Sequence, residues 1–577
     1  MKRAAVLIGV EKTGGLPRLK AARKGAEDMA AWTQAQGFAT HLLTDAAGPV
    51  DVAAIRAKIR ELVDPGNLDQ LLVYFAGHGV NIRFGEFWLL SDAPVDADQA
   101  VNVAGAEALA RRCGIPHVIL LSDACRTAAE GVQAQSIDGS AIFPNVDPSG
   151  LEKSVDLFFA ATLGAPSHEV RDPQDSSKRY SAVYTDELLA SLNGTYSEAL
   201  VTDPADGMLV LRPRPLKKQL ERKVPARIAQ LLGNAVPVTQ TPDARITSDD
   251  DAWLARFPAA APADFANESM PFPAAPVSTP VTPPSVASAT RSALRTAVSS
   301  ATPVSDAIDV LSVGVGNKVA DEVMRDAASF GPLHFETQCG FKVRGARVRA
   351  AFIDKGGADL FDDSLIRVNL PGRPASNVLI ELTDGRGVLL PAVQDFVASL
   401  SFEEGELRNV AYEPSDNTSR WQMYAAQQNE MSALRSLIAS SARVGGFRLD
   451  REDAPQLTER IRFAKSIDPT MALYAAYSYH NLGRRDLIRD MQRYLRDDIG
   501  VTFFDLAMLA GDAIPPRPGD QRIFPFVPML AQGWSLLDAF AIRLPDSLAR
   551  LRHSVGTSLW TVFDETGVRT VRAALEG

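Results

Sequence analysis

A histidine and a cysteine stand 47 positions apart, each just after a run of apolar residues. His78 follows the apolar residues 71–75, and Cys125 follows the apolar residues 118–121. In an open α/β sheet, ligand sites form at the edge where parallel strands end, so we expect both side chains there. A cysteine thiolate is a strong nucleophile, and a neighbouring imidazole can move its proton. The pattern therefore predicts the nucleophilic catalysis of a cysteine endopeptidase.

Two neighbours of this pair are of types that suit peptide hydrolysis. Gly79 has no side chain, so its backbone N–H can approach a substrate closely. Asp123 lies two residues before Cys125, and in an extended chain both side chains point to the same side. An acidic pocket selects arginine or lysine by charge pairing, which predicts a basic residue before the scissile bond. The alternative for Asp123 is a strand-end cap or a structural hydrogen bond.

These motifs resemble those of the caspase, metacaspase and paracaspase superfamily. The resemblance lies in Tyr-Phe-Ala-Gly-His-Gly at residues 74–79 and Ser-Asp-Ala-Cys-Arg at residues 122–126. Asp123 stands where caspases have glutamine, and Thr127 stands where they have glycine. An aspartate at this position is the pattern of metacaspases and paracaspases. The resemblance covers roughly residues 1–200.

The resemblance implies a caspase-like fold and a catalytic dyad of His78 and Cys125, without a third catalytic carboxylate. It implies an oxyanion hole formed by the backbone N–H groups of Gly79 and Cys125. It also implies cleavage after arginine or lysine, with Asp123 in the pocket and a second acid supplied by the first helix. Asp28 is the matching residue, and an exposed helix charge is the alternative for it.

Strand and helix patterns alternate through residues 1–200. Short apolar runs are typical of strands buried on both faces, and they occur at residues 4–10, 71–75, 118–121 and 157–161. Helical spacing of apolar residues occurs at residues 19–37, 52–62, 105–112 and 183–192. The alternation predicts an α/β domain with a mainly parallel sheet and helices on both faces, in agreement with the caspase-like fold.

The rest of the chain changes character several times. Residues 201–257 are basic and then acidic, and we interpret them as a tail of the first domain. Residues 258–304 are rich in Pro, Ala, Ser and Thr and indicate an extended linker, with a loop packed on the domain as the alternative. Alternating runs and two hairpin signals in residues 305–415 predict a small antiparallel β domain. Residues 416–577 are predicted to form an α-helical domain.

Composition narrows the class of protein. The net charge of −10 argues against a nucleic-acid partner, and no apolar run is long enough for a membrane segment. Three cysteines without metal spacing fit a reducing bacterial cytoplasm. We expect no cofactor and no metal. Asp138 and Asp147 bring to mind the calcium dependence of some metacaspases, but their spacing matches no calcium loop.

Three functions remain open at this point. The first is an endopeptidase acting on a protein substrate, whose C-terminal domains regulate it or recruit substrate by binding a ligand or partner. The second is a catalytically silent caspase-like scaffold, and the third is a transferase that uses the same thiol. No Lys or Arg occurs between Arg126 and Lys153, so we expect that self-cleavage of this segment is not obligatory.

Overall fold

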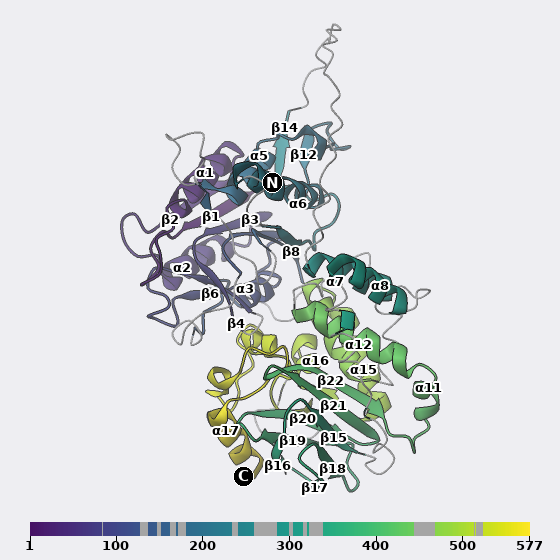
Figure 1. Cartoon of the computed structure of the whole chain (residues 1–577). Helices are drawn as coiled ribbons and strands as arrows, with labels where there is room; N and C mark the ends of the chain where they lie inside the picture. The colour runs from purple at the N-terminus through teal and green to yellow at the C-terminus, as the bar shows by residue number, and fades with distance from the viewer. Residues whose placement is uncertain are drawn as a thin grey trace.

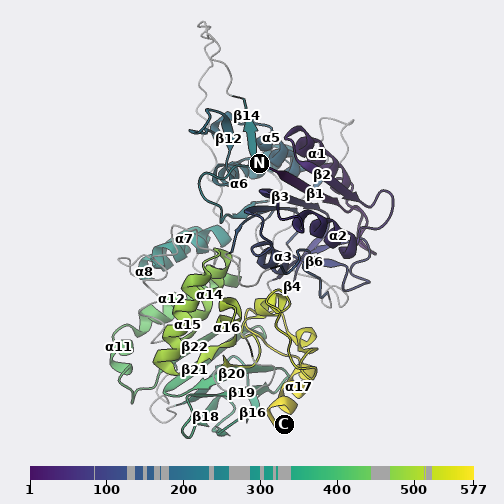
Figure 2. The ribbon, with the colours of Figure 1, turned by 180° about the vertical axis from the view of Figure 1, so that it is seen from behind.

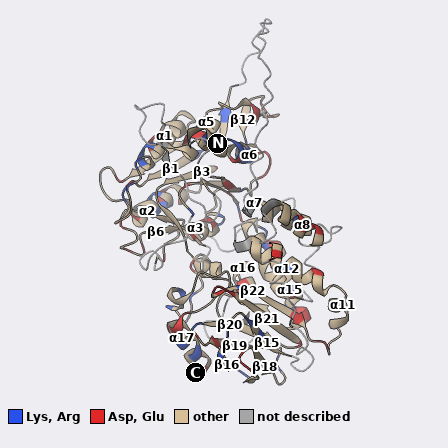
Figure 3. Ribbon diagram, in the orientation of Figure 1, with Lys and Arg blue, Asp and Glu red and all other residues tan. Residues whose placement is uncertain are grey.

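The protein folds into two packed halves, an N-terminal half that is uppermost in Figure 1 and a C-terminal half below it, also seen from behind in Figure 2. In Figure 3, basic and acidic residues are interspersed over both halves. The computed structural model describes residues 1–82, 85–126, 137–146, 152–161, 169–170, 181–232, 240–258, 286–298, 304–315, 320–321, 330, 339–443, 468–512, 514 and 523–576.

A six-stranded sheet forms the centre of the N-terminal half, in the order β13-β8-β7-β3-β1-β2. Five strands are parallel, and β13 at one edge pairs antiparallel with β8. The inner strands β1, β3 and β7 are buried along their whole length, as expected for strands covered on both faces. The strands are β1 (Arg3–Gly9), β2 (Ala39–Thr44), β3 (Gln70–Ala76), β7 (His117–Asp123), β8 (Ser154–Phe159) and β13 (Asp243–Arg245).

Helices cover both faces of this sheet (Figure 1). On one face, α1 (Ala22–Ala35), α5 (Val183–Leu192) and α6 (Pro213–Leu232) enclose a core with alternate residues of the strands. On the other face, α2 (Val52–Val63) and α3 (Val103–Ala110) contribute to a second core. The predicted α/β architecture with a mainly parallel sheet is thereby confirmed.

The described residues of the segment 201–257 are an integral part of this half, whereas the sequence predicted a tail of the domain. The α6 helix buries Leu216, Leu220, Val224 and Ile228, which are four residues apart and form one apolar stripe between basic residues. The segment also supplies the edge strand β13. A small sheet of β11 (Leu200–Thr202), β12 (Leu209–Leu211) and β14 (Ala255–Phe257) completes it.

Two sheets form the β-rich part of the C-terminal half. One has the order β17-β18-β15-β21-β22 and the other the order β16-β19-β20. Both predicted hairpins are present, as β19–β20 and β21–β22, but β15 pairs parallel with β21, so the first sheet is mixed. The strands are β15 (Gly340–Arg344), β16 (Val348–Ile353), β17 (Gly357–Leu360), β18 (Leu365–Asn369), β19 (Ala375–Leu382), β20 (Gly387–Val393), β21 (Phe396–Glu403) and β22 (Glu406–Pro414).

Helices pack around these sheets. Two of these helices, α7 and α8, lie before residue 416, where the sequence predicted the helical domain to begin. The α7 helix (Val286–Val298) lies within the expected linker and buries Ala289, Ala293 and Ala297, which are four residues apart. The α8 helix (Val304–Val315) lies where the β domain was expected to begin. Residues 259–285 of the predicted linker lie outside the described residues. The later helices are α11 (Trp421–Ala425), α12 (Gln428–Arg443), α14 (Thr470–Asn481), α15 (Arg485–Ile499), α16 (Phe504–Ala510) and α17 (Glu565–Glu576).

The expected C-terminal helical region contains a long irregular part. Residues 523–564 form bends, turns, β24 (Ile523–Phe524) and two short 3-10 helices, η2 (Ala531–Leu536) and η3 (Leu551–Ser554). Pro525, Pro528 and Pro545 interrupt this stretch, and proline removes the N–H that a longer helix needs. Within the described part of the chain, no helix is long and apolar enough to cross a membrane.

Candidate active site

The register of two parallel strands brings His78 and Cys125 to the same edge of the central sheet. Strands β3 and β7 are neighbours, and Ala76 at the end of β3 is opposite Asp123 at the end of β7. His78 and Cys125 each follow two residues later. The backbone N–H of Gly77 also donates to the carbonyl of Asp123 (3.4 Å), which continues the pairing beyond the strands. Cys125 is half-buried at this edge.

The histidine is fixed from two sides. Its carbonyl accepts a hydrogen bond from the N–H of Leu89 (2.9 Å), within a small sheet of β4 (Gly79–Ile82), β5 (Gly85–Leu89) and β6 (Ala100–Asn102). Its ring atom Nε2 lies 2.6 Å from the carbonyl oxygen of Pro17. A carbonyl only accepts, so Nε2 carries the proton and Nδ1 of the neutral ring is the basic atom. Pro17 could not be identified from the sequence, because it acts through its backbone carbonyl.

This environment sets the protonation of the histidine. Burial lowers the pKa of His78 below its ordinary value of 6.5, and the hydrogen bond to Pro17 partly offsets this effect. As the pH falls, the ring therefore stays neutral, and able to accept a proton, to a lower pH than an exposed histidine. For the same reason, this group destabilises the fold as the pH falls below 6.5, because the unfolded chain binds the proton more readily.

We expect the acid limb of the pH profile of kcat/KM to have its midpoint below pH 6.5, since activity is lost when His78 is protonated. The measurement is peptide hydrolysis across the acid range. The alkylation rate of Cys125 by iodoacetamide provides a control that needs no substrate pocket. A midpoint at or above pH 6.5 in both assays would contradict a partly buried histidine with a lowered pKa.

Gly79 packs directly against the cysteine segment. A Cβ atom built on Gly79 would lie 2.5 Å from the carbonyl oxygen of Cys125 and 2.7 Å from Cβ of Ala124. Both distances are far shorter than van der Waals contact, so only glycine fits at this position without a shift of the backbone. The close approach places the backbone of Gly79 beside Cys125, as an oxyanion hole made by these two residues requires.

Arg126 anchors the chain directly after the cysteine. Its side chain is 2% exposed and pairs with Glu86 (3.0 Å) and Asp243 (3.2 Å). It also donates to the carbonyl of Ala161 (3.1 Å) and lies 4.1 Å from the centre of the Phe159 ring. The sequence motif included this arginine, but its buried partners come from three separate segments and had no sequence signal.

Asp123, the predicted pocket residue, is buried at the end of β7. Its Oδ2 atom accepts a hydrogen bond from the hydroxyl of Thr185 in the first turn of α5. Thr185 in turn lies 2.6 Å from the hydroxyl of Tyr74 on β3. Neither Tyr74 nor Thr185 was identified as a site residue from the sequence.

The second predicted pocket acid, Asp28, lies on α1 and pairs with Lys24 of the same helix. Its side chain is 41% exposed, which agrees with the alternative of an exposed helix charge. The residue of α1 that packs against the Asp123 network is Gly25. A Cβ atom built on Gly25 would lie 2.8 Å from the hydroxyl of Tyr74. Asp28 therefore stays a prediction that no contact of the structure supports.

Other predicted features fall partly outside the described residues. The segment after Arg126 is described only at residues 137–146 and from residue 152, and Asp147 is not among these residues. Asp138 is described and lies 3.5 Å from Nε2 of His553. Among the described residues, no group of three or more His, Cys, Asp or Glu side chains could hold a metal ion.

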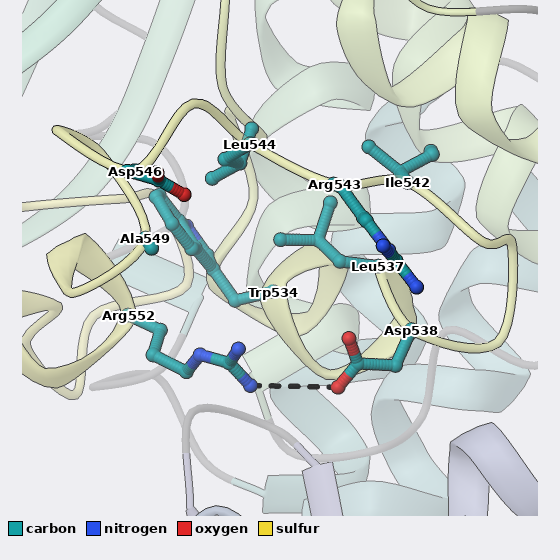
Figure 4. Close-up of a pocket in the computed structure, with 9 residues that line it drawn as sticks. All are labelled: Trp534, Leu537, Asp538, Ile542, Arg543, Leu544, Asp546, Ala549 and Arg552. Atoms are coloured by element: carbon teal, nitrogen blue, oxygen red, sulfur yellow. Dashed lines mark hydrogen bonds and ion pairs between the residues drawn. The ribbon is translucent and has the colours of Figure 1, made fainter. Parts of the chain in front are cut away.

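A cavity of about 230 Å³ lies in the C-terminal half (Figure 4). Its apolar lining includes Trp534 and Leu537, and Asp538 at its rim pairs with Arg552 at 3.4 Å. Two arginines and two aspartates line it, so its charge favours neither an anion nor a cation. The lining residues are Trp534, Leu537, Asp538, Ile542, Arg543, Leu544, Asp546, Ala549 and Arg552.

The family comparison agrees with this geometry. Residues 2–204 match the family model of the caspase domain, a family of cysteine peptidases, so this part of the chain belongs to the caspase-like superfamily. No match was found among curated proteins.

A comparison with solved structures found matches to part of the chain, two of which follow. A crystal structure of a protein from Geobacter sulfurreducens is 16% identical and covers 44% of this chain and 98% of its own, with a TM-score of 0.31. Caspase-1 from Spodoptera frugiperda is 14% identical and covers 42% of this chain and 87% of its own, with a TM-score of 0.29.

Proposed function

We propose that the protein is a cysteine endopeptidase that hydrolyses peptide bonds after arginine or lysine. The observation that carries this proposal is the register of β3 and β7, which brings His78 and Cys125 to one edge, with Gly79 packed against the cysteine segment. The superfamily of residues 2–204 supports it. We also propose a cytoplasmic location, because three cysteines without a disulfide framework fit a reducing compartment.

The reaction follows from the residues at this edge. The basic Nδ1 atom of His78 takes the proton of the Cys125 thiol, and the thiolate attacks the carbonyl carbon of the scissile bond. The N–H groups of Gly79 and Cys125 stabilise the oxyanion of the tetrahedral intermediate. His78 then gives its proton to the leaving amine, which breaks the C–N bond and leaves a thioester. His78 then deprotonates a water molecule, which attacks the thioester carbon. The C–S bond breaks, the acid product leaves, and the proton on His78 returns to the sulfur of Cys125.

Asp123 gives the proposed preference for a basic side chain. Its carboxylate is buried two residues before the nucleophile, on a strand end whose side chains face α1 and α5. A guanidinium or ammonium group that enters here is paired with a desolvated carboxylate, which strengthens the attraction relative to water.

Covalent labelling with a peptidyl chloromethyl ketone tests this function. We expect a ketone that ends in arginine to add once to the intact protein, at Cys125, and a ketone that ends in aspartate to react far more slowly. The other thiols are poor competitors, because burial raises the pKa of Cys113 and raises the pKa of Cys339 to about 12. His78→Gln is the matched control and should lose the label. Equal labelling by both ketones would contradict the basic specificity.

The C-terminal half contacts the small sheet of β4, β5 and β6 that follows His78, and we propose that it regulates the peptidase. The Nδ2 atom of Asn102 on β6 donates to the carbonyl of Ser535 (2.6 Å). Gly85, at the start of β5, faces the side chain of Ser535. Arg112 donates to the carbonyl of Ala539 (2.5 Å). These contacts brace the small sheet that holds the carbonyl of His78.

A buried polar cluster strengthens the same interface. Glu107 pairs with Arg111 (2.5 Å) and with Arg245 (2.9 Å) in the N-terminal half. Both arginines also bond to Asn481 at the end of α14, at 3.0 Å and 2.8 Å. Burial and the nearby Arg111 charge lower the pKa of His480 to about 3, so this histidine is neutral and adds no repulsion. Two arginines whose charges are paired with Glu107 in the N-terminal half therefore donate hydrogen bonds across the interface to Asn481.

We expect Asn102→Asp to lower kcat/KM several-fold. The carboxylate still accepts from the N–H of Gly105 and so keeps the cap of α3, but it can no longer donate to Ser535 and repels that carbonyl instead. Peptide hydrolysis and the thermal midpoint are the measurements. Asn193→Asp makes the same chemical change at an exposed site and serves as control. An unaltered kcat/KM would show that the C-terminal brace does not act on the dyad.

A further inference from the structure

A buried chain of hydroxyl groups ends on the predicted pocket carboxylate. Thr185 contacts Oδ2 of Asp123, and the hydroxyl of Tyr74 lies 2.6 Å from the hydroxyl of Thr185. Tyr74 is 0% exposed and Thr185 is 2% exposed, so the chain is closed to water. It joins β3 and β7, the strands that end just before His78 and Cys125, to α5, which packs on one face of the sheet.

The chemistry of the groups fixes the direction of the hydrogen bonds. An ionised carboxylate only accepts, so the hydroxyl of Thr185 donates to Asp123. That hydroxyl has one proton, and therefore the hydroxyl of Tyr74 donates to Thr185. Burial raises the pKa of Tyr74 well above its ordinary value, and the negative charge of Asp123 raises it further, so the phenol keeps its proton.

The α1 helix packs beside this chain of hydroxyl groups, and its Gly25 leaves room for the hydroxyl of Tyr74. A Cβ atom on Gly25 of α1 would lie 2.8 Å from the hydroxyl of Tyr74 and 3.4 Å from Cγ2 of Thr185. The second tyrosine of this region, Tyr184, is also fully buried, and its pKa is raised by burial and then by the charge of Asp123. The carboxylate thus lies among closely packed, buried side chains, where a hydrogen bond is stronger than in water.

We propose that Thr185 and Tyr74 are positioning residues that hold the carboxylate of Asp123 in one rotation and so make the enzyme prefer arginine over lysine. The inference rests on the proposed function and goes beyond it. A planar guanidinium bonds to a carboxylate through two parallel N–H groups, which demands a defined plane of the carboxylate. An ammonium group is a point charge and tolerates rotation of its partner. Loss of the hydroxyl chain therefore penalises arginine more than lysine.

The test compares Thr185→Val and Thr185→Ser on two fluorogenic peptides that differ only in Arg or Lys before the scissile bond. For Thr185→Val we expect kcat/KM to fall about 10-fold or more with the Arg peptide, mainly through KM, and less with the Lys peptide. Thr185→Ser keeps the hydroxyl and should restore the wild-type ratio. Tyr74→Phe should shift the Arg/Lys ratio in the same direction by a smaller factor.

The rate of Cys125 alkylation by iodoacetamide separates positioning from general damage, because it needs no pocket. It should be unchanged in all three variants. A wild-type Arg/Lys ratio in both Thr185→Val and Tyr74→Phe would overturn the inference and leave the proposed function intact. Failure of the wild-type enzyme to cleave either peptide would overturn the proposed function and the inference together.

Discussion

Gly79→Ala is expected to lower kcat/KM by about 100-fold or more while the protein remains folded. The added Cβ would meet the carbonyl oxygen of Cys125 at 2.5 Å and Cβ of Ala124 at 2.7 Å. Both are fixed atoms, one in the backbone and one directly on it, so the two segments must move apart. The movement displaces the N–H donors from the oxyanion, and removal of one such donor typically costs a factor of about 100 to 1,000 in kcat.

Gly48→Ala is the matched control for this substitution. Gly48 has nothing within 4 Å of its Cβ position, so the same chemical change should leave activity unaltered. Peptide hydrolysis by both variants, with thermal unfolding to show that each is folded, decides the question. Wild-type kcat/KM in Gly79→Ala would mean that Gly79 has no part in the reaction.

Arg126→Met is expected to destabilise the protein by about 3 to 5 kcal/mol, because it leaves two buried carboxylates without their cation. The guanidinium is 2% exposed, and its partners Glu86 and Asp243 are 6% and 3% exposed. The measurement is the shift of the urea or thermal unfolding midpoint. Arg60→Met changes an exposed arginine and is the control.

A triple variant tests whether the uncompensated carboxylates cause this loss of stability. Adding Glu86→Gln and Asp243→Asn to Arg126→Met removes the uncompensated charges, so it should recover part of the lost stability. If Arg126→Met shifts the unfolding midpoint no more than Arg60→Met does, the buried cluster contributes little to the anchoring of Cys125.

The shared sheet edge of His78 and Cys125 and the central sheet could be predicted from the sequence because their signals are local. Cys125 and His78 end apolar runs that are long enough to read as strands, and the helix over residues 183–192 has the bounds that its spacing predicted. Both hairpins of the β-rich part have a Gly at the turn, with runs that contain apolar residues on either side. Such patterns depend only on neighbours in the chain.

The remaining parts depend on contacts between distant residues. Pro17 orients His78 through a carbonyl, which every residue type possesses. The choice between Gly25 and Asp28 depends on the rotation of α1 against β3, and the sequence favoured the charged residue over the small one that packs there. The α7 helix was hidden by the proline-rich composition before it, although its alanines recur every four residues.

The most direct test of the proposed endopeptidase activity is hydrolysis of two fluorogenic peptides, one ending in Arg and one in Asp, by wild type and by Cys125→Ala. We predict that the wild-type full-length chain cleaves the Arg peptide alone and that Cys125→Ala has no activity, since the thiolate is the nucleophile. Cleavage of the Arg peptide by Cys125→Ala would contradict the proposed nucleophile. Cleavage of the Asp peptide by wild type would contradict the role of Asp123, and silence on both peptides would contradict the assignment as an endopeptidase for basic sites.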